Sequence, residues 1–432
     1  MPLKYPYLGA FESTKIHGSG KDVLETTRHY TRWEHDLDML LSSGIRELRY
    51  SVPWHRIEQR PGVFDWSWLD GPMKFLEVNG MDPILDPLHH TSFPDWLDQG
   101  FANPQFPERY ANFLLELRRR YSWANRYTLF NEPLPTTLFC SHTGMWYPHK
   151  STDRDFIAMA TNVAKAVCLG AAAVSREAPA VFVHIDTCEH HKADDREAEE
   201  QAEFCNQRRF LMHDLVLGAV SRNHPAHEYL SQNGFSDDDR LWLQDHATRI
   251  DVLGLDYYAH SELVWFRDRD TDRITYYTPD PYPRGFADIA KEYSERFRVP
   301  VMLGETNVRG RVTDRLTWLK FMTEQCDELA QEVDFRGFCW YPSIDSTDWS
   351  NCCTQATNSV DPQGIWWLDQ RRWRRHSSKL SDCYSALARG EMTSQDLPAY
   401  SLQPPVDALL HGYQRFMRRW PMWEQANSEE AA

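Results

Sequence analysis

Two glutamates stand where an apolar run of the sequence gives way to a loop. Glu132 closes the stretch RYTLFNEP, and Glu305 closes VPVMLGETN. Four or five β-prone residues followed by Gly, Asn or Pro are typical of a buried strand that ends at a surface rim. A carboxylate at that place costs stability unless it is paired or hydrogen-bonded, so two of them indicate a functional site. Paired carboxylates are the working groups of most enzymes that cleave glycosidic bonds.

The two glutamates predict a specific chemistry if the fold brings them together. A glycosidase that retains the anomeric configuration needs its carboxyl groups about 5–5.5 Å apart, one as nucleophile and one as acid/base. The acid must hold a proton near neutral pH, so burial or the second carboxylate has to raise its pKa. Neither motif, Asn-Glu-Pro or Gly-Glu-Thr-Asn, supports the prediction alone, because Asn-Glu-Pro occurs as readily in a capped turn before a helix. The prediction depends on the two motifs together, each at the end of a strand.

Eight short β-prone runs supply the strands that must position these residues. Between them lie amphipathic helical segments such as residues 26–44, which end at Gly44, and residues 107–122, which begin at Pro107. The strand candidates are residues 5–11, 45–54, 82–90, 125–133, 180–188, 249–258, 299–307 and 335–342.

Eight strands alternating with helices predict an α/β fold, the (β/α)₈ TIM barrel. In that fold catalytic groups lie at the carboxyl ends of the strands, and the fourth and seventh strands face each other. No Gly-rich phosphate-binding fingerprint follows any strand, which argues against an open doubly wound sheet and a dinucleotide-dependent oxidoreductase.

The domain organisation follows from the spacing of the strands. Roughly 35 to 55 residues separate successive strands, against about 30 in a minimal barrel unit, so we expect enlarged βα loops. Residues 1–390 are predicted to form one catalytic barrel, and residues 391–432 to pack on its outside with a disordered end. The acidic, His-containing segment 189–204 is interpreted as a solvated helix face or an insertion loop.

Composition limits the partners and the location. The formal charge of −16 argues against nucleic acid as a partner, because binding to phosphate groups requires clustered Lys and Arg. The N-terminal residues lack the pattern of a secretory signal, and no run approaches the roughly 20 apolar residues that cross a bilayer. Nine cysteines, an odd number, fit free thiols better than a disulfide framework. A cytoplasmic protein without a membrane partner is the expectation.

A metal site is the other chemistry that the sequence raises. His184, His190 and His191 form a local group with Cys188. Their spacing lacks a second paired unit and does not match structural zinc patterns. We therefore expect neither a metal nor another cofactor.

Seven segments in order resemble those of family 1 glycoside hydrolases, or of a close relative in the same clan of retaining (β/α)₈ enzymes. YTLFNEP closely resembles the fourth-strand pattern WxTFNEP, and DVLGLDYY is similar to the sixth-strand FIGLNYY. The remaining five segments are RYSVPWHRIEQRPGVFDW, PLHHTSFPDWL, VPVMLGETN, GFCWYPSIDSTDW and QGIWWLD, of which the last two resemble FAWSLLDNFEW and RFGLVYVD.

The resemblance implies roles for the residues at the matching positions. Glu132 would be the acid/base and Glu305 the nucleophile. Asn131 would hydrogen-bond the sugar 2-hydroxyl, and Arg49 would lie beside Glu305 and keep it ionised. Tyr257 would hydrogen-bond the nucleophile, whereas its neighbour Tyr258 would point the opposite way, into the core.

The same resemblance implies further sugar contacts. His90 would contact the 3-hydroxyl, although His89 beside it competes for that role. Trp340 would form the floor under the sugar ring and precede a cis peptide bond. Asp348 and Trp349 stand where the family has the Glu-Trp pair that binds the 4- and 6-hydroxyls.

Two segments depart from the family pattern. The first-strand pattern SAYQxEG supplies a Gln for the 3- and 4-hydroxyls. Here the segment is GAFESTKIHG, so that Glu12, Ser13 or Lys15 would have to replace the Gln. The nucleophile motif is Gly-Glu-Thr-Asn where the family has Thr-Glu-Asn-Gly. These departures leave the sugar open.

The sequence therefore predicts an enzyme that hydrolyses β-linked glycosides, small molecules or oligosaccharides, with net retention. A transglycosylase would use the same two steps and differ only in the acceptor. A sugar-binding barrel that has lost catalysis is the alternative from another class.

Overall fold

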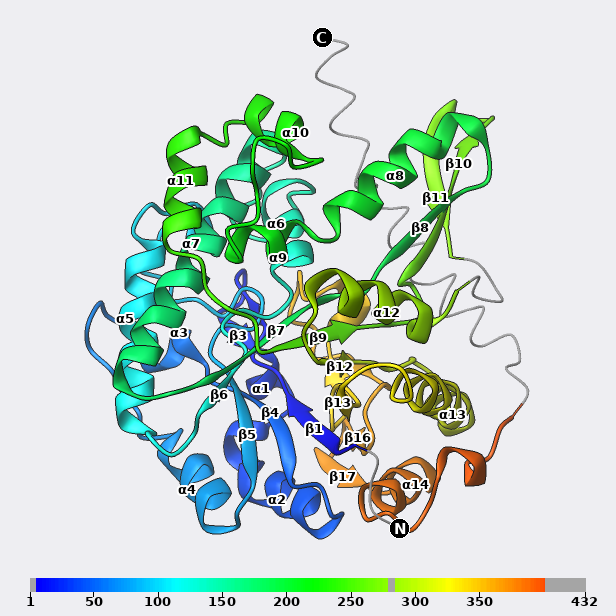
Figure 1. The fold of residues 1–432 in the computed structure, drawn as a ribbon. Coiled ribbons are helices and arrows are strands. Elements are labelled where there is room, and N and C mark those ends of the chain that lie inside the picture. The colour runs from blue at the N-terminus through cyan, green and yellow to red at the C-terminus, as the bar shows by residue number, and fades with distance from the viewer. Residues whose placement is uncertain (1–4, 279–283, 401–432) are drawn as a thin grey trace.

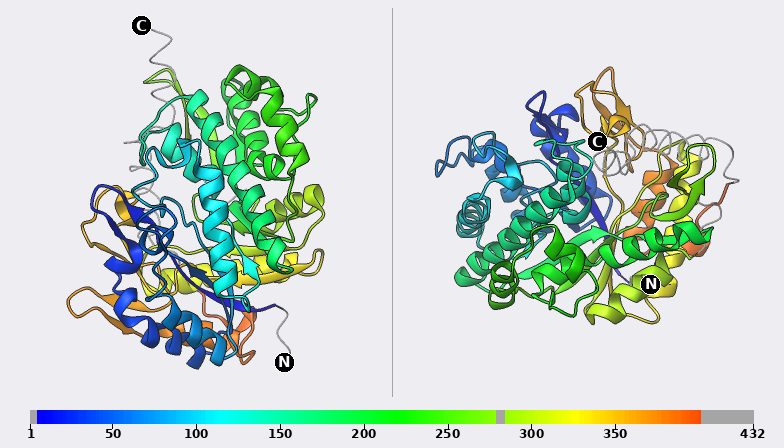
Figure 2. Two further views of the ribbon diagram at one scale, coloured as in Figure 1. Left: turned by 90° about the vertical axis from the view of Figure 1, so that its left-hand side faces the viewer. Right: turned by 90° about the horizontal axis from the view of Figure 1, so that it is seen from above.

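The computed structural model describes residues 5–278 and 284–400. Eight parallel strands close into a barrel, which confirms the predicted fold (Figures 1 and 2). The strands follow one another around the barrel in chain order, and β1 pairs with both β4 and β13 to close it. The barrel strands are β1 (Tyr7–Phe11), β4 (Glu47–Ser51), β5 (Asp82–Asp86), β6 (Arg126–Tyr127), β7 (Val181–Thr187), β9 (Val252–Asp256), β12 (Val301–Glu305) and β13 (Phe335–Cys339).

Side chains alternate between the inside of the barrel and the helical layer outside it. The inner cluster consists of Leu8, Ala10, Ile84, Val183, Ile185, Met302, Cys339 and Tyr341, and all eight are buried. Their neighbours in the strands, such as Leu85 and Leu303, belong to the larger cluster under the helices. Because strand side chains alternate with period two, this parity decides which residues reach the site.

The helices surround the barrel. The predicted segments 26–44 and 107–122 form α2 and α5, and α5 has its proline at the first turn as expected. The helices are α1 (Val23–Thr26), α2 (His29–Ser42), α3 (Trp54–Ile57), α4 (Asp70–Val78), α5 (Phe106–Arg120), α6 (Pro133–Ser141), α7 (Asp153–Glu177), α8 (Glu199–Arg208), α9 (Leu211–Val216), α10 (His227–Gln232), α11 (Asp237–Asp245), α12 (Phe286–Phe297), α13 (Val312–Leu329) and α14 (Lys379–Ala388).

Contrary to the expectation from the sequence, helix α7 is long and apolar enough to cross a membrane by length and composition alone. Of its most apolar stretch, 72% is buried inside the protein. It packs side by side with α5 and also contacts α6 and α9. Its apolar faces are thus used within the fold, as in a core helix.

Segment 189–204 is an insertion with its own structure. It forms β8 (His190–Ala193) and the start of α8, and β8 joins β10 (Glu262–Asp268) and β11 (Arg273–Tyr277) in a small sheet. The insertion interpretation is therefore right, but a solvated helix face is only part of the segment. The other short strands pair as β2 (Lys15–Ile16) with β3 (Lys21–Asp22), β14 (Ser346–Thr347) with β15 (Val360–Asp361), and β16 (Trp367–Asp369) with β17 (Arg374–His376).

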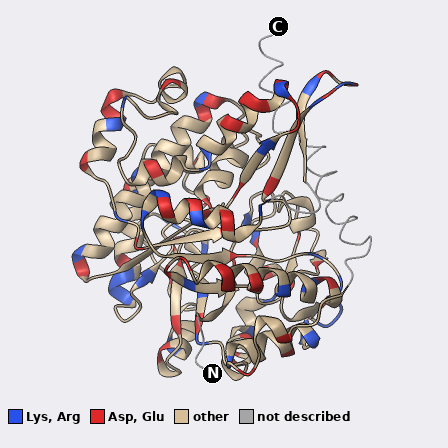
Figure 3. Cartoon of the chain, turned by 45° about the vertical axis from the view of Figure 1, so that its right-hand side comes forward, with Lys and Arg blue, Asp and Glu red and all other residues tan. Residues whose placement is uncertain are grey.

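The charged residues and the C-terminal segment relate to the predictions about partners and domain organisation. Figure 3 shows acidic and basic residues interspersed over the helices on the side of the molecule that it presents. Residues 391–400 run along α13, where Lys320 donates to the carbonyls of Ser394 and Leu397. Residues 401–432 lie outside the described residues, so the expected disordered end, like the single-domain organisation, stays a prediction.

Candidate active site

Both predicted catalytic glutamates lie at the carboxyl end of the barrel. Glu305 is the last residue of β12, and Glu132 follows β6 after residues 128–131. The backbone N–H of Glu132 donates to the carbonyl of Ile185 at 3.1 Å, so β7 still holds the chain after β6 has ended. Glu132 has a φ of 45°, a left-handed conformation that is uncommon outside glycine and is found at functional sites.

Glu132 and Glu305 meet in one cavity, and Asp256 joins them. One carboxylate oxygen of each residue lies within 4.8 Å of one oxygen of each of the other two. The cavity encloses about 200 Å³, and its lining includes His90, Glu132, Tyr258, Glu305, Tyr341 and Trp349. The separation of Glu132 and Glu305 suits direct attack by one carboxylate beside proton donation by the other.

Glu305 has partners that stabilise a negative charge. Arg49 Nη1 donates to Glu305 Oε1 at 2.6 Å, and the hydroxyl of Tyr258 donates to Oε2 at 2.6 Å. Arg49 is fully buried, and a charge-assisted hydrogen bond in such surroundings is strong. The two bonds fix the orientation of the Glu305 carboxylate.

Glu132 has the opposite surroundings. Burial raises the pKa of Glu132 well above its ordinary value, and the neighbouring charges of Glu305 and Asp186 raise it further. Its nearest imidazole is that of His90, with Nε2 3.5 Å from Glu132 Oε2. A carboxyl group in these surroundings keeps its proton near neutral pH, as a general acid must.

Asp256 is the member of the group that the sequence analysis did not select. It ends β9 and is fully buried, and among residues 5–278 and 284–400 neither of its carboxylate oxygens has a hydrogen-bond partner. Gly304 makes room for it, because a Cβ there would lie 2.4 Å from Asp256 Oδ1. Burial raises the pKa of Asp256 well above its ordinary value, and the charges of Glu305 and Glu132 add to the rise. A signal was present in the sequence, since Asp256 is a carboxylate at a strand end.

Arg49 organises the floor beneath the two glutamates. Besides Glu305, its guanidinium donates to Asn131 Oδ1 at 2.5 Å and to Asp86 Oδ2 at 3.4 Å. The predicted contact between Arg49 and Glu305 is thus confirmed. Asn131 is fully buried in this network, with Nδ2 3.3 Å from His89 Nε2. Its predicted bond to a sugar 2-hydroxyl stays a prediction.

The structure corrects the assignment of the two adjacent tyrosines. The hydroxyl of Tyr257 donates to Glu262, and its ring stacks against Trp318 in the helical layer. The partner of Glu305 is Tyr258 instead. The prediction was wrong about parity, because Asp256 and Tyr258 point into the barrel whereas Leu255 and Tyr257 point outward.

Trp340 is corrected in the same way. It lies in the outer cluster, where its Nε1 donates to the carbonyl of Gln363 at 2.8 Å. Tyr341 lines the cavity, beneath Arg49 and hydrogen-bonded to His89. The expected cis peptide bond is also displaced by one residue, to Tyr341–Pro342. In the family pattern FAWSLLDNFEW the Trp stands four residues before the Asp. Tyr341 stands four residues before Asp345, so the match that selected Trp340 was shifted by one residue.

Asp348 does not face the cavity. Its carboxylate accepts hydrogen bonds from the backbone N–H groups of Thr357, Asn358 and Ser359, so it anchors that loop and has no access to a sugar. The expectation that Asp348 binds hydroxyls was therefore wrong. Trp349 does line the cavity, and its Nε1 donates to Glu12 Oε1 at 2.6 Å.

Of the three candidates to replace the family's Gln, Glu12 is the one that contacts Trp349 and His89. It is buried, accepts from Ser346 and Trp349, and lies 3.5 Å from His89 Nε2. Lys15 instead pairs with Asp95. Ser13 Oγ is buried without a hydrogen-bond partner.

The two adjacent histidines occupy different depths. His90 lines the cavity, and its Nδ1 bonds to Thr136 Oγ1 at 2.8 Å. His89 lies deeper, with Nδ1 2.6 Å from Asp86. Burial lowers the pKa of His89, but Asp86, Glu12 and Glu305 outweigh burial and leave it above its ordinary value. His90 is therefore the one of the two that lines the cavity, and its predicted contact with a sugar 3-hydroxyl stays a prediction.

The local His/Cys group of the sequence does not form as a set. His191 bonds to Glu189 and receives a hydrogen bond from Trp265, and Cys188 is a buried free thiol. His184 points instead toward His213.

Comparisons with known proteins agree with this geometry. A family model described as glycosyl hydrolase family 1 matches residues 10–281. Beta-glucosidase A of Thermotoga maritima is 24% identical over 363 residues, which span 74% of this chain and 79% of that protein. Beta-galactosidase BgaH of Haloferax lucentense is 31% identical over 103 residues, which span 24% of this chain and 14% of that protein.

Solved structures show the same fold. The beta-glucosidase from Thermotoga maritima in complex with methoxycarbonyl-substituted glucoimidazole superposes with a TM-score of 0.76 at 17% identity, over 90% of this chain and 98% of that one. The same enzyme in complex with deoxynojirimycin gives a TM-score of 0.75 at 16% identity, with the same coverage.

Proposed function

The chain belongs to glycosyl hydrolase family 1 and is a β-glucosidase-like glycoside hydrolase, and from that premise we propose that it cleaves β-linked glycosides with net retention. Glu305 is the nucleophile and Glu132 the acid/base. The observation that carries the proposal is the contrast between them. Their oxygens lie within 4.8 Å of each other, yet Arg49 and Tyr258 donate hydrogen bonds to Glu305, whereas burial raises the pKa of Glu132 well above its ordinary value.

The first step forms a covalent glycosyl-enzyme. A carboxylate oxygen of Glu305 attacks the anomeric carbon, and the bond from that carbon to the departing oxygen breaks. Glu132 gives its proton to the departing oxygen, which leaves as an alcohol. Arg49 remains hydrogen-bonded to Gly304 O at 3.2 Å and to Asn131, so it keeps its position as the charge on Glu305 is consumed.

The second step releases the sugar. Glu132, now a carboxylate, takes a proton from water, whose oxygen attacks the anomeric carbon. The bond to Glu305 breaks and its carboxylate returns to Arg49 and Tyr258. Two inversions give net retention. The return of the proton to Glu132 is favoured by the same burial that raises its pKa.

Labelling with a 2-deoxy-2-fluoro β-glycoside bearing a good leaving group tests this proposal. The fluorine slows the second step more than the first, so the glycosyl-enzyme should accumulate. Mass spectrometry of a digest should find the sugar on the peptide that contains Glu305, at about one equivalent per chain. A label on Glu132, or steady hydrolysis with inversion seen by NMR, would refute the assignment.

Tyr258 and Tyr257 form a matched pair for a second test. Tyr258→Phe removes the hydrogen bond to Glu305 and should lower kcat/KM about 10- to 100-fold, since hydrogen bonds to charged groups contribute about 1.5–3 kcal/mol. Tyr257→Phe removes a bond to Glu262 outside the cavity and should change kcat/KM by less than about 3-fold. Equal losses of kcat/KM in the two variants would contradict the roles assigned here.

We also propose a reducing compartment, the cytoplasm, as the location. All nine cysteines of the chain are buried and free, which supports that proposal because disulfides form in oxidising compartments. Fractionation of the producing cell with antibody detection tests it, and enrichment outside the cytoplasm would contradict it.

A further inference from the structure

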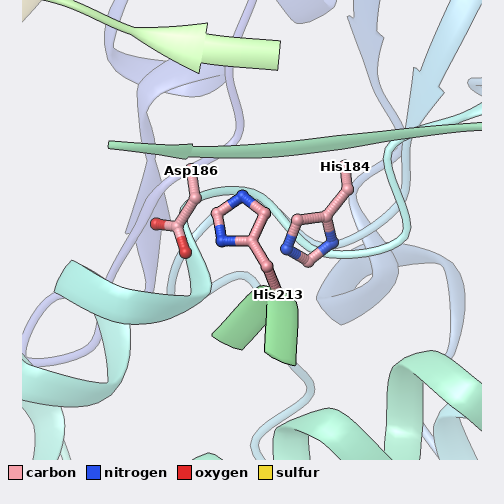
Figure 4. A group of neighbouring side chains, drawn as sticks. All are labelled: His184, Asp186 and His213. Carbon is pink, nitrogen blue, oxygen red and sulfur yellow. The ribbon is translucent and has the colours of Figure 1, made fainter. Parts of the chain in front are cut away.

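Three ligand-type side chains meet behind the barrel wall, outside the cavity described above. They are His184 and Asp186 of β7 and His213 of α9 (Figure 4). Their exposed fractions are 7%, 0% and 0%. One ligand atom of each lies within 4.8 Å of one ligand atom of each of the others. In Figure 4 the ring of His213 lies between the two side chains that come from β7.

Strand parity explains why these residues meet. Val183 and Ile185 point into the barrel, so His184 and Asp186 both point outward, two residues apart on one face of β7. Helix α9 covers this face and supplies His213. The neighbouring helical residues Leu211, Met212 and Leu215 are buried apolar side chains, and His213 stacks on Phe297 at 5.1 Å. Apolar side chains thus surround the three polar side chains.

The two histidines are short of hydrogen-bond partners. His184 Nε2 and both ring nitrogens of His213 are buried and have none among the described residues. A buried polar group left unsatisfied costs about 1–3 kcal/mol, and such groups call for an explanation.

Asp186 lacks a cation. Its carboxylate accepts from the backbone N–H groups of Leu134 and Thr187, and within residues 5–278 and 284–400 it has no ion pair with a basic side chain. The nearby Arg296 bonds to Asp214 instead. Two imidazoles with unpartnered nitrogens and a buried carboxylate without a basic partner would therefore all be satisfied by one cation that has vacant coordination positions.

We propose that His184, Asp186 and His213 bind one divalent transition-metal ion, and that zinc is the ion they suit best. Neutral imidazole nitrogen and carboxylate oxygen are ordinary zinc donors. Coordination at about 2.0–2.1 Å places tetrahedral donors roughly 3.3 Å apart, so the side chains close inward by about 1 Å on binding. The ion satisfies the unpartnered nitrogens and offsets the charge of Asp186 at once.

The role of this ion is structural. The cluster is enclosed and does not line the active-site cavity, so a substrate does not reach it. The ion joins β7 to α9. Through Asp186, which accepts from Leu134 N, it also holds the first turn of α6, directly after Glu132. The proposal does not depend on the catalytic roles of Glu132 and Glu305.

Metal titration of the untagged protein tests the site. After treatment with a chelator, Zn²⁺ or Co²⁺ should bind at about one equivalent per chain and raise Tm by about 5 °C or more at saturating metal. Cu²⁺-loaded protein should show two imidazole nitrogens by pulsed EPR. The three acids of the active site offer oxygen ligands only, so an EPR signal without two nitrogens would overturn the proposal.

Variants complete the design. His213→Phe keeps a ring of similar size against Phe297 and removes both nitrogens, so metal binding and the rise in Tm should be lost. His35→Phe, a change at a side chain that is 58% exposed, should leave both unchanged. If His213→Phe is more stable than the wild type and the wild type ignores metals, the cluster is a core of neutral histidines. Binding that persists in His213→Phe would place the ion elsewhere and also overturn the proposal.

Discussion

Glu305→Gln should lower kcat by at least about 10⁴-fold, the largest effect that we expect of any single change. The amide has the shape of the carboxylate but is a very poor nucleophile, so the glycosyl-enzyme does not form. Arg49 loses its anionic partner at 2.6 Å as well. Substrate should still bind, because the cavity keeps its shape. Single-turnover kinetics with a nitrophenyl β-glycoside, together with a binding measurement on an inhibitor, would separate the two effects.

Glu262→Gln is the matched control for the nucleophile. Glu262 is also buried, and it accepts hydrogen bonds from Tyr257 and from the backbone N–H of Gly285. It lies outside the cavity lining. Its replacement tests the general damage done by an amide at a buried glutamate, and kcat should stay within a few-fold of the wild type. Wild-type turnover by Glu305→Gln would end the double-displacement account.

Glu132→Ala should produce a loss that depends on the leaving group. General acid catalysis contributes about 10²- to 10⁴-fold, so glycosides of poor leaving groups should lose about that much in kcat/KM. Dinitrophenolate leaves without a proton, so the first step with a dinitrophenyl glycoside should be nearly unchanged. The second step still lacks its base, so a burst of dinitrophenolate should precede slow turnover.

Azide separates the two carboxylates by stereochemistry. In Glu132→Ala it can occupy the vacated space and attack the glycosyl-enzyme, which should restore turnover and give a β-glycosyl azide. In a nucleophile variant azide attacks the substrate itself and gives the α product. An α-glycosyl azide from Glu132→Ala, seen by NMR, would exchange the two roles.

The barrel was predictable from the sequence because each strand carries a local signal. All eight strand candidates became barrel strands in the predicted order, and Glu305 ends its strand as expected. The shortest strand, β6, comprises only Arg126–Tyr127, yet the motif after it still identified Glu132. Motifs of this kind depend on residues next to each other in the chain, which the sequence displays directly.

Two of the errors in the predicted site concern which face of the chain a side chain occupies. Tyr257 and Tyr258 differ by one residue, and so do Trp340 and Tyr341. In both pairs the residue that reaches the cavity is the second. The orientation of the strand in the barrel decides which residues point inward and which point outward. A strand that is buried on both faces has no alternation of polar and apolar residues, so its sequence does not show this orientation. Asp348 was misassigned because its backbone partners, residues 357–359, lie in a loop that the motif does not include.

The amino-acid order by itself determined the barrel, the family-like motifs and the two glutamates, because each depends on neighbours in the chain. Tertiary structure alone decided that Asp256 joins Glu132 and Glu305, since three strands bring these residues together. It also brought His213 next to His184 and Asp186, although His213 is too far along the chain for the residue spacing of known metal motifs to predict the group. Contacts between residues far apart in sequence depend on how the helices pack on the barrel, and no local pattern encodes that packing.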